Sequence, residues 1–204
     1  VVLTHPQADH LTGLVEVLRR YKVRQVLYAD LKYDSPLYSE WLSLIKTRNI
    51  KYTPAQARQH IDFGSDVTIE VLNPQTPPLT ETDMNNNSVV LRLTMGRVSF
   101  LLTADIMQAA ELGLITQRAN LNSTVLKVAH HGSDTSTGQE FLAVVNPRIA
   151  VVCVGENNKF GLPNQEVVAR LEQKLGQGNV YRTDEQGTIE FITNGQRLWL
   201  RLGR

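Results

Sequence analysis

Two histidines and an aspartate lie within six positions near the start of the chain, as His5, Asp9 and His10. Imidazole nitrogens together with a carboxylate are a ligand set that suits zinc, manganese or iron. The three residues follow the apolar run 1–3 and precede leucines at helical spacing, so we expect them in a loop between a strand and a helix. In such a loop, side chains three to five positions apart can converge on one point. Alternatively, Asp9 caps the following helix and the histidines are polar loop residues.

A second candidate, Asp105, ends the apolar run 101–104. A carboxylate at the end of a buried strand can bridge two metal ions about 3.5–4 Å apart. The same residue could equally cap a helix that starts at Ile106. Taken alone, this position leaves both interpretations open.

The third cluster is His130-His131-Gly132, at the end of the apolar run 125–129. A histidine pair suits one metal ligand and one neighbour that touches substrate, and the glycine permits the tight turn that such a site needs. Four of the five histidines thus follow apolar strands, whereas His60 lies in a polar stretch and is expected at the surface. This repeated pattern at strand ends predicts a metal site.

Alternating strands and helices must bring these clusters together. Apolar spacing predicts helices from Leu11 onward, after Ser35-Pro36, and over 106–118, 139–145 and 165–175. We expect strands at 1–4, 25–28, 67–72, 88–93, 98–103, 125–129, 149–154, 180–182, 188–193 and 197–202, and a long loop over 74–87. Because hairpins are frequent among these strands, a mixed or antiparallel α/β (α+β) layered fold fits better than a doubly wound parallel sheet.

The composition limits the number of domains and the classes of partner. With 204 residues, 42% of them apolar, the chain can bury one substantial core, so we expect a single domain over 1–204. The net charge is +1, and the charged residues are scattered along the chain rather than grouped. The charge pattern therefore gives no indication that the protein binds nucleic acid or a membrane surface. Apolar stretches are too short for a membrane helix, and a single cysteine, Cys153, excludes a disulfide framework.

Taken in order, the three clusters resemble the successive motifs of the metallo-β-lactamase superfamily. The motifs are His5-x-x-x-Asp9-His10, the strand that ends in Asp105, and Leu-Lys-Val-Ala-His-His-Gly-Ser over 126–133. The branch most similar to this chain is formed by the C-terminal domain of the DNA-uptake competence protein ComEC and its free-standing relatives. Further matches lie at 86–91, 154–158 and 181–187, so the resemblance covers essentially the whole chain.

The resemblance implies an αββα sandwich of mixed sheets with a metal site at one edge. It also implies one or two divalent ions, zinc or manganese. Its ligand assignment is His5 for the first ion, Asp9 and His10 for the second, Asp105 as a bridge, and His131 completing the second site, with His130 facing substrate. On this assignment Asp9, Asp105 and His130 belong to the reacting centre.

By the same resemblance, the chain is a metal-dependent hydrolase of phosphodiesters, most similar to a DNA nuclease linked to DNA uptake. Single-stranded or double-stranded DNA would be the substrate, and the remainder of a membrane-embedded uptake channel the partner. A soluble domain belonging to a bacterial inner-membrane protein is therefore expected. Two alternatives stay open: a degenerate, non-catalytic binding or structural module of the same fold, and a hydrolase of another phosphoester.

Three departures from the family pattern are visible. Gln7 stands where the fuller motif has its middle histidine, and an amide oxygen is a poor zinc ligand, which tilts the expectation towards manganese. Leu162 stands where relatives carry the histidine of Tyr-Gly-His-Pro, so one substrate-facing group is lost. The family's opening strands are expected before Val1, which makes the chain look like a C-terminal fragment that lacks them.

Overall fold

The small sheet of the protein buries both of its faces. In the computed structural model, which describes residues 1–64, 66–80 and 83–203, this sheet is parallel throughout and has the order β1 (Val2–Leu3), β2 (Gln25–Tyr28), β3 (Lys51–Pro54). Successive side chains of a strand point to opposite faces. Accordingly, Val26 and Tyr28 enter one hydrophobic core and Leu27 enters another.

The large sheet is mixed. Its order is β10 (Val180–Arg182), β9 (Ile149–Val152), β8 (Val125–Lys127), β7 (Val98–Leu102), β6 (Val90–Met95), β5 (Val67–Asn73), β4 (His60–Asp62). From β10 to β7 neighbouring strands are parallel, and from β7 to β4 they are antiparallel. The mixed sheet predicted from the frequent hairpins is therefore confirmed.

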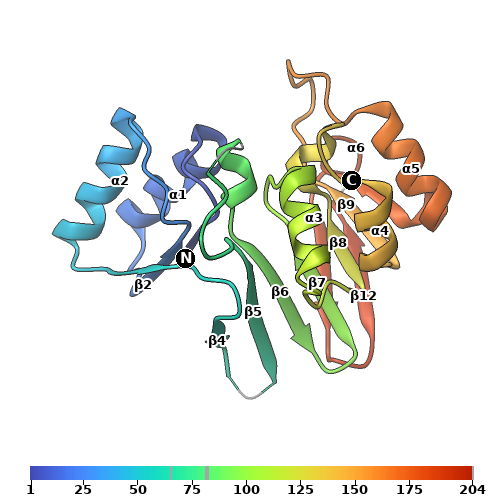
Figure 1. Ribbon diagram of the computed structural model, residues 1–204, viewed down its shortest axis with the longest axis horizontal. Helices are drawn as coiled ribbons and strands as arrows, with labels where there is room; N and C mark the ends of the chain where they lie inside the picture. The colour runs from blue at the N-terminus through green and yellow to red at the C-terminus, as the bar shows by residue number, and fades with distance from the viewer. Residues whose placement is uncertain (65, 81–82, 204) are drawn as a thin grey trace.

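Helices cover the outer face of each sheet, and Figure 1 shows them on the two sides of the molecule. The helices α1 (Ala8–Arg20) and α2 (Pro36–Thr47) share a core with the small sheet. On the other side, α3 (Gln108–Thr116), α4 (Gln139–Val145) and α5 (Gln165–Leu175) pack on the large sheet. A third core lies between the sheets, where Leu27 and Ala29 meet Val71 and Leu91. These three cores separate four layers, which confirms the αββα sandwich.

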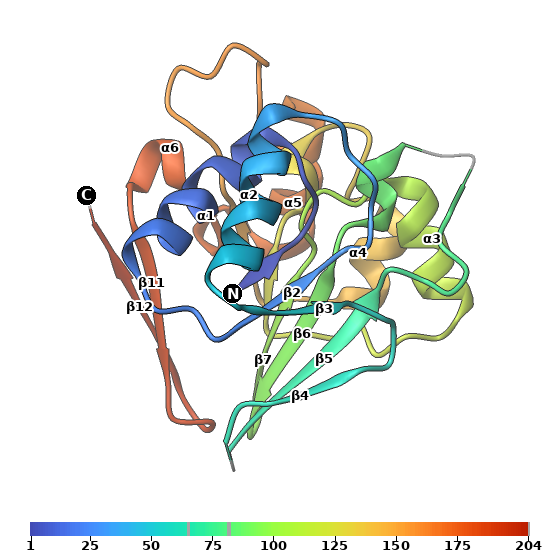
Figure 2. The same ribbon diagram turned by 90° about the vertical axis from the view of Figure 1, so that its left-hand side faces the viewer.

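The last part of the chain adds a short helix and a hairpin. Helix α6 (Thr183–Gln186) precedes the antiparallel pair β11 (Ile189–Thr193) and β12 (Leu198–Leu202). Phe191 of the hairpin lies edge-on against Phe100 of β7, with ring centroids 5.7 Å apart. The hairpin therefore packs on the large sheet, along the side of the molecule that Figure 2 shows at the left.

Most predicted elements match the structure, and α4, α5, β2 and β10 match to the residue. Strands β3 and β4 were not predicted, because they are short, carry polar side chains and show no apolar alternation. The predicted loop at 74–87 ends in a 3-10 turn at Met84–Asn87, and its residues 81–82 lie outside the described residues. No helix in the described ranges is long and apolar enough to cross a membrane.

Candidate metal centre

The parallel pairing of β7 and β8 brings Asp105 and the histidine pair to the same edge of the large sheet, where both strands end. In the register of the two strands Leu102 is the partner of Lys127, so the loops that follow them start side by side. The Lys127 ammonium donates to the Ala104 carbonyl at 3.0 Å, and the His130 amide donates to the same oxygen at 3.1 Å. The two loops are therefore joined directly beside Asp105.

The small sheet supplies the other half of the site. The prediction that the helix begins after His10 is wrong: α1 begins at Ala8, because the Gln7 carbonyl already accepts from the amides of His10 and Leu11. Asp9 and His10 thus lie in the first helical turn rather than in a loop. Where β1 ends, the Thr4 carbonyl accepts from the Val89 amide at 3.0 Å, which ties this segment to the large sheet.

Asp9, His10, Asp105 and His131 form one group, with one potential ligand atom from each residue lying within 4.8 Å of the others. The Oδ2 atom of Asp105 lies 3.1 Å from Nε2 of His10 and 3.2 Å from Nε2 of His131. The Oδ2 atom of Asp9 faces the same two nitrogens, at 3.4 and 3.5 Å. The arrangement offers two imidazole nitrogens and two carboxylates to one point, a ligand set that zinc and manganese both accept.

His5 and His130 lie next to this group but outside it. His5 is completely buried, with its Nε2 3.8 Å from Oδ2 of Asp105 and its ring centroid 4.1 Å from that of His10. The His130 ring centroid is 6.5 Å from that of His131, and its Nδ1 contacts the Thr135 hydroxyl at 3.1 Å. Of the two adjacent histidines, the structure brings His131 and not His130 into the group.

Unpaired buried atoms show that the group suits a cation. Within the described part of the chain, Nε2 of His5, Nε2 of His131 and Oδ1 of Asp105 are buried and make no hydrogen bond of good geometry. Buried polar atoms are rarely left in this state. All three are lone-pair donors when the ring nitrogens are unprotonated, so the residues fit a divalent metal ion.

The opposite ring nitrogens are held by neighbours. The Nδ1 atom of His131 donates to the Cys153 carbonyl at 2.7 Å, and Nδ1 of His10 contacts the Thr4 hydroxyl at 3.3 Å. A ring whose Nδ1 is a donor in its neutral form presents the lone pair of Nε2, and such outer contacts orient metal-binding histidines. Thr4 and the Cys153 carbonyl are thus parts of the site that the sequence alone did not indicate.

The protonation of each residue in the group depends on the charges of its neighbours. Burial raises the pKa of the Asp105 carboxyl, but the hydrogen bond with His10, the close contact with His131 and the charge of Lys127 outweigh it and hold that pKa well below its ordinary value. The carboxylates of Asp105 and Asp9, whose Oδ2 atoms lie 3.2 and 3.5 Å from Nε2 of His131, raise the pKa of that ring to about 10. Contacts with His10 and His131 also lower the pKa of Asp9. Both carboxylates therefore remain ionised at neutral pH and attract a cation or protons to this point.

His5 behaves in the opposite way. Burial, followed by the neighbouring charge of His10, lowers the pKa of His5 to about 4. The ring is therefore neutral at pH 7, which is the form that binds a metal.

Strained backbone accompanies the site residues. Ala104, His130 and His131 have φ values of 49°, 47° and 54°, in the left-handed region that costs a non-glycine residue on the order of 1 kcal/mol or more. Gly132 follows at φ 81°, and a Cβ there would lie 2.6 Å from Cβ of Pro163. Only glycine fits at this close approach, which explains the residue type after the histidine pair.

The two departures within the site differ in position. Gln7 is the residue before the first turn of α1 and makes no capping hydrogen bond with its side chain. Leu162 is half-buried in the loop that precedes Pro163. Neither residue belongs to the four-residue group.

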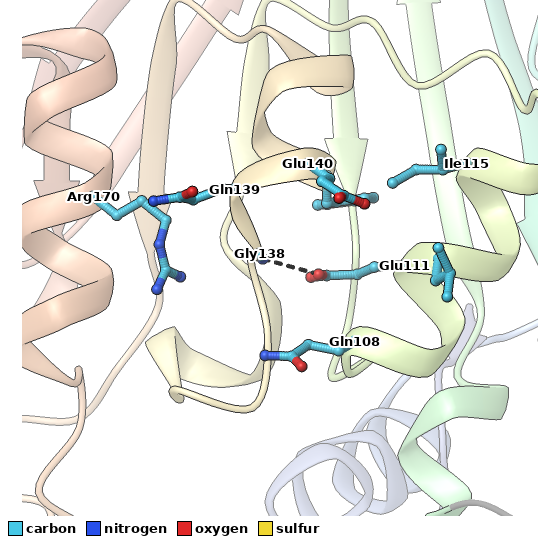
Figure 3. A pocket seen from close by; sticks show the side chains of 9 residues that line it. Gln108, Glu111, Ile115, Gly138, Gln139, Glu140 and Arg170 are labelled. Atoms are coloured by element: carbon cyan, nitrogen blue, oxygen red, sulfur yellow. Dashed lines mark hydrogen bonds between the residues drawn. The ribbon is translucent and has the colours of Figure 1, made fainter.

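A separate pocket of about 430 Å³ lies between α3, α4 and α5, and Figure 3 shows its side chains. The lining contains none of the residues proposed as ligands from the sequence. At its wall Glu111, which is 2% exposed, accepts hydrogen bonds from the amides of Thr137 and Gly138, the latter at 3.0 Å. This contact ties α3, which follows Asp105, to the segment that follows His131. No pattern in the sequence marked Glu111.

Comparison with known proteins identifies relatives over most of the chain. ComE operon protein 3 of Bacillus subtilis (strain 168) is 29% identical over 191 residues, which are 94% of this chain and 24% of that protein. The uncharacterized protein YcaI of Escherichia coli (strain K12) is 31% identical over 199 residues, 97% of this chain and 24% of YcaI. The competence protein ComA of Neisseria gonorrhoeae is 36% identical over 110 residues, 53% of this chain and 16% of ComA. The chain thus spans about a quarter or less of the length of these relatives.

A solved structure shares the architecture. The metallo-beta-lactamase fold protein YhfI from Bacillus subtilis superposes with a TM-score of 0.55 at 12% identity, covering 98% of this chain and 77% of YhfI. At this identity the similarity concerns the fold alone. The sequence profile of the metallo-beta-lactamase superfamily matches residues 1–156, a stretch that contains every ligand candidate described above, and the chain therefore belongs to this superfamily.

Proposed function

We propose that the chain is a metal-dependent hydrolase of phosphodiesters, and specifically a nuclease that acts on DNA during DNA uptake. The observation that carries this proposal is the group of two carboxylates and two imidazoles around Oδ2 of Asp105, with the outer nitrogens of both rings already held by neighbours. The proposal is further supported by the competence proteins among the relatives.

Asp9, His10, Asp105 and His131 would hold one divalent ion, and His5 would serve a second one across Asp105. Bound there, divalent metal supplies Lewis acidity towards a phosphoryl oxygen and makes water a nucleophile at neutral pH. The charges of the two carboxylates balance the cation. Thr4 and the Cys153 carbonyl keep the imidazoles in the orientation that binding requires.

His130 would face the substrate. Its Nδ1 is engaged by the Thr135 hydroxyl, so Nε2 is the nitrogen left to touch a phosphate oxygen or to give a proton to the leaving oxygen. Being half-buried beside His131, the ring stands at the margin of the group rather than within it. This division of roles gives the two adjacent histidines different chemistry.

We further propose that residues 1–204 form one domain of a longer, membrane-embedded uptake protein in the bacterial inner membrane. The support is the length of the relatives, of which this chain matches about a quarter. The remainder of such a protein would be the partner of this domain, and either single-stranded or double-stranded DNA its substrate.

Metal content and hydrolysis test the proposal together. Purified protein should carry at least about half an equivalent of transition metal or gain it from added manganese or zinc, and should degrade single-stranded DNA. Asp105→Ala should lose both properties. His60→Ala is the matched control, because His60 is exposed and lies outside the group, and it should keep both.

Three results would contradict the proposal in different ways. Protein that binds no metal under any of these conditions would favour a degenerate module, for which Gln7 and Leu162 are the relevant departures. Hydrolysis that survives in Asp105→Ala would assign the activity to a contaminant or to another site. If metal-loaded protein cleaves another phosphoester, such as a phosphorylcholine ester, but not DNA, the proposed metal chemistry holds and the proposed substrate is wrong.

A further inference from the structure

The loop between β9 and α5 is attached at one end to His131 and at the other to Gly132, the next residue. At its start, the Cys153 carbonyl accepts from Nδ1 of His131 at 2.7 Å. At its end, the Asn164 amide donates to the Gly132 carbonyl at 2.9 Å, and Pro163 packs directly on Gly132. The base of the loop therefore lies beside His131.

The loop is organised from within by one side chain. Asn158 donates through Nδ2 to the carbonyls of Gly155 and Leu162, at 3.1 and 2.7 Å. Its Oδ1 accepts from the amides of Phe160 and Leu162, at 3.2 and 3.1 Å. Four hydrogen bonds to a single amide group hold the turn in one shape, so the residues at its tip are presented in a fixed arrangement.

The tip presents an aromatic ring to solvent. Phe160 is 73% exposed, and the Lys159 ammonium lies 5.4 Å from the centroid of its ring. In Figures 1 and 2 this loop, drawn in orange at the top of the molecule near α6, extends beyond the other elements. The combination of an exposed ring, a neighbouring cation and an ordered turn offers a face on which a planar group can stack.

We propose that Phe160 and Lys159 form a stacking platform for an unpaired base of a single-stranded nucleic acid. A phosphodiester of the same strand would lie at the candidate metal centre formed by Asp9, His10, Asp105 and His131. Bases stack on aromatic side chains with little regard to sequence, and a cation beside the ring attracts the neighbouring phosphate. A base inside a duplex is already stacked and offers no free face to the ring. The platform therefore favours single-stranded over double-stranded substrate. This inference deepens the proposed function and rests on it.

Binding without turnover tests the platform. The probe is a dye-labelled phosphorothioate oligothymidylate, which keeps bases and charge but resists hydrolysis, and its affinity for metal-loaded protein is measured by fluorescence anisotropy. Phe160→Ala should bind about 10-fold more weakly, and Phe160→Trp should restore or exceed the original affinity. Phe63→Ala is the matched control, because Phe63 is 70% exposed and follows β4, outside this loop, and its affinity should not change.

An abasic phosphorothioate of equal length separates stacking from charge. The wild-type protein and Phe160→Ala should bind it equally, whereas Lys159→Ala should weaken the binding of both probes and reduce its salt dependence. Equal affinity of wild type and Phe160→Ala for the oligothymidylate would overturn the platform, as would wild-type protein that binds no oligothymidylate. If Phe160→Ala weakens binding but the wild type cleaves no DNA, the platform stands and the nuclease proposal fails.

Discussion

Replacing Thr4 by valine should weaken metal binding while leaving the fold in place. The Thr4 hydroxyl lies 3.2 Å from Nδ1 of His5 and 3.3 Å from Nδ1 of His10, so one oxygen serves two histidines. Each ring that binds metal through Nε2 carries its proton on Nδ1 and needs an acceptor there. Valine has the shape of threonine but offers no acceptor to either ring.

The size of the effect follows from the loss of these outer contacts. Removing such a partner of a metal-binding histidine lowers metal affinity by about 10–100-fold, or about 1.4–2.8 kcal/mol. The upper half of this range is expected for Thr4→Val, because a second ring, the fully buried His5, loses its partner in the same substitution.

Competition with a fluorescent zinc chelator measures the affinity directly. Thr4→Ser keeps the hydroxyl and loses only a methyl group, so it should stay within about twofold of wild type, and urea unfolding of the metal-free proteins should establish that all three are folded. If Thr4→Val binds zinc as tightly as wild type, the hydroxyl does not orient these rings and the reasoning from the outer contacts is wrong.

Three further predictions concern stability. Burial lowers the pKa of His5 to about 4, against 6.5 in the unfolded chain, so the unfolded state binds this proton at a higher pH than the folded state. His5 should therefore contribute a loss on the order of 3 kcal/mol to metal-free protein as the pH falls from 7 to 4, and in urea titrations at the two pH values His5→Asn should lose less than wild type by that amount. Glu111→Gln should cost about 1–3 kcal/mol in urea unfolding, because glutamine offers one acceptor oxygen to the two amides that Glu111 accepts from, whereas exposed Glu140→Gln should cost less than about 0.5 kcal/mol. Zinc at about 1,000 times its Kd should raise the unfolding free energy of wild type by about 4 kcal/mol, and a chelator should reverse this gain. In thermal unfolding, Asp105→Asn should show no such stabilisation by zinc. An equal stabilisation of Asp105→Asn would mean that Asp105 does not bind the ion.

The sequence was most informative where apolar periodicity and strand ends coincide. Helices α4 and α5 and strand β10 were predicted to the residue, because their apolar spacing is regular and turn residues flank them. The clustering of His10, Asp105 and His131 was also foreseeable, since each residue follows or adjoins an apolar strand. The structure adds the finding that their side chains meet in one group.

Other parts of the site depend on contacts that no local pattern encodes. The early start of α1 depends on the Gln7 carbonyl, and the role of Thr4 depends on two rings from different turns meeting one hydroxyl. The Cys153 carbonyl is a backbone group, so its residue type carries no signal. Glu111 lies in a largely apolar helix, and only tertiary packing reveals the two amides from which it accepts hydrogen bonds.

The division of the donors between the two halves of the sandwich has a kinetic consequence. His10 comes from the helix over the small sheet and Asp105 from the end of the large one, 95 positions later in the chain. If these residues hold one ion as proposed, each half supplies two of its four ligands, so a newly synthesised chain completes the site only after both sheets have docked. A substitution that loosens the core between the sheets should then speed the loss of metal to a chelator without touching a single ligand.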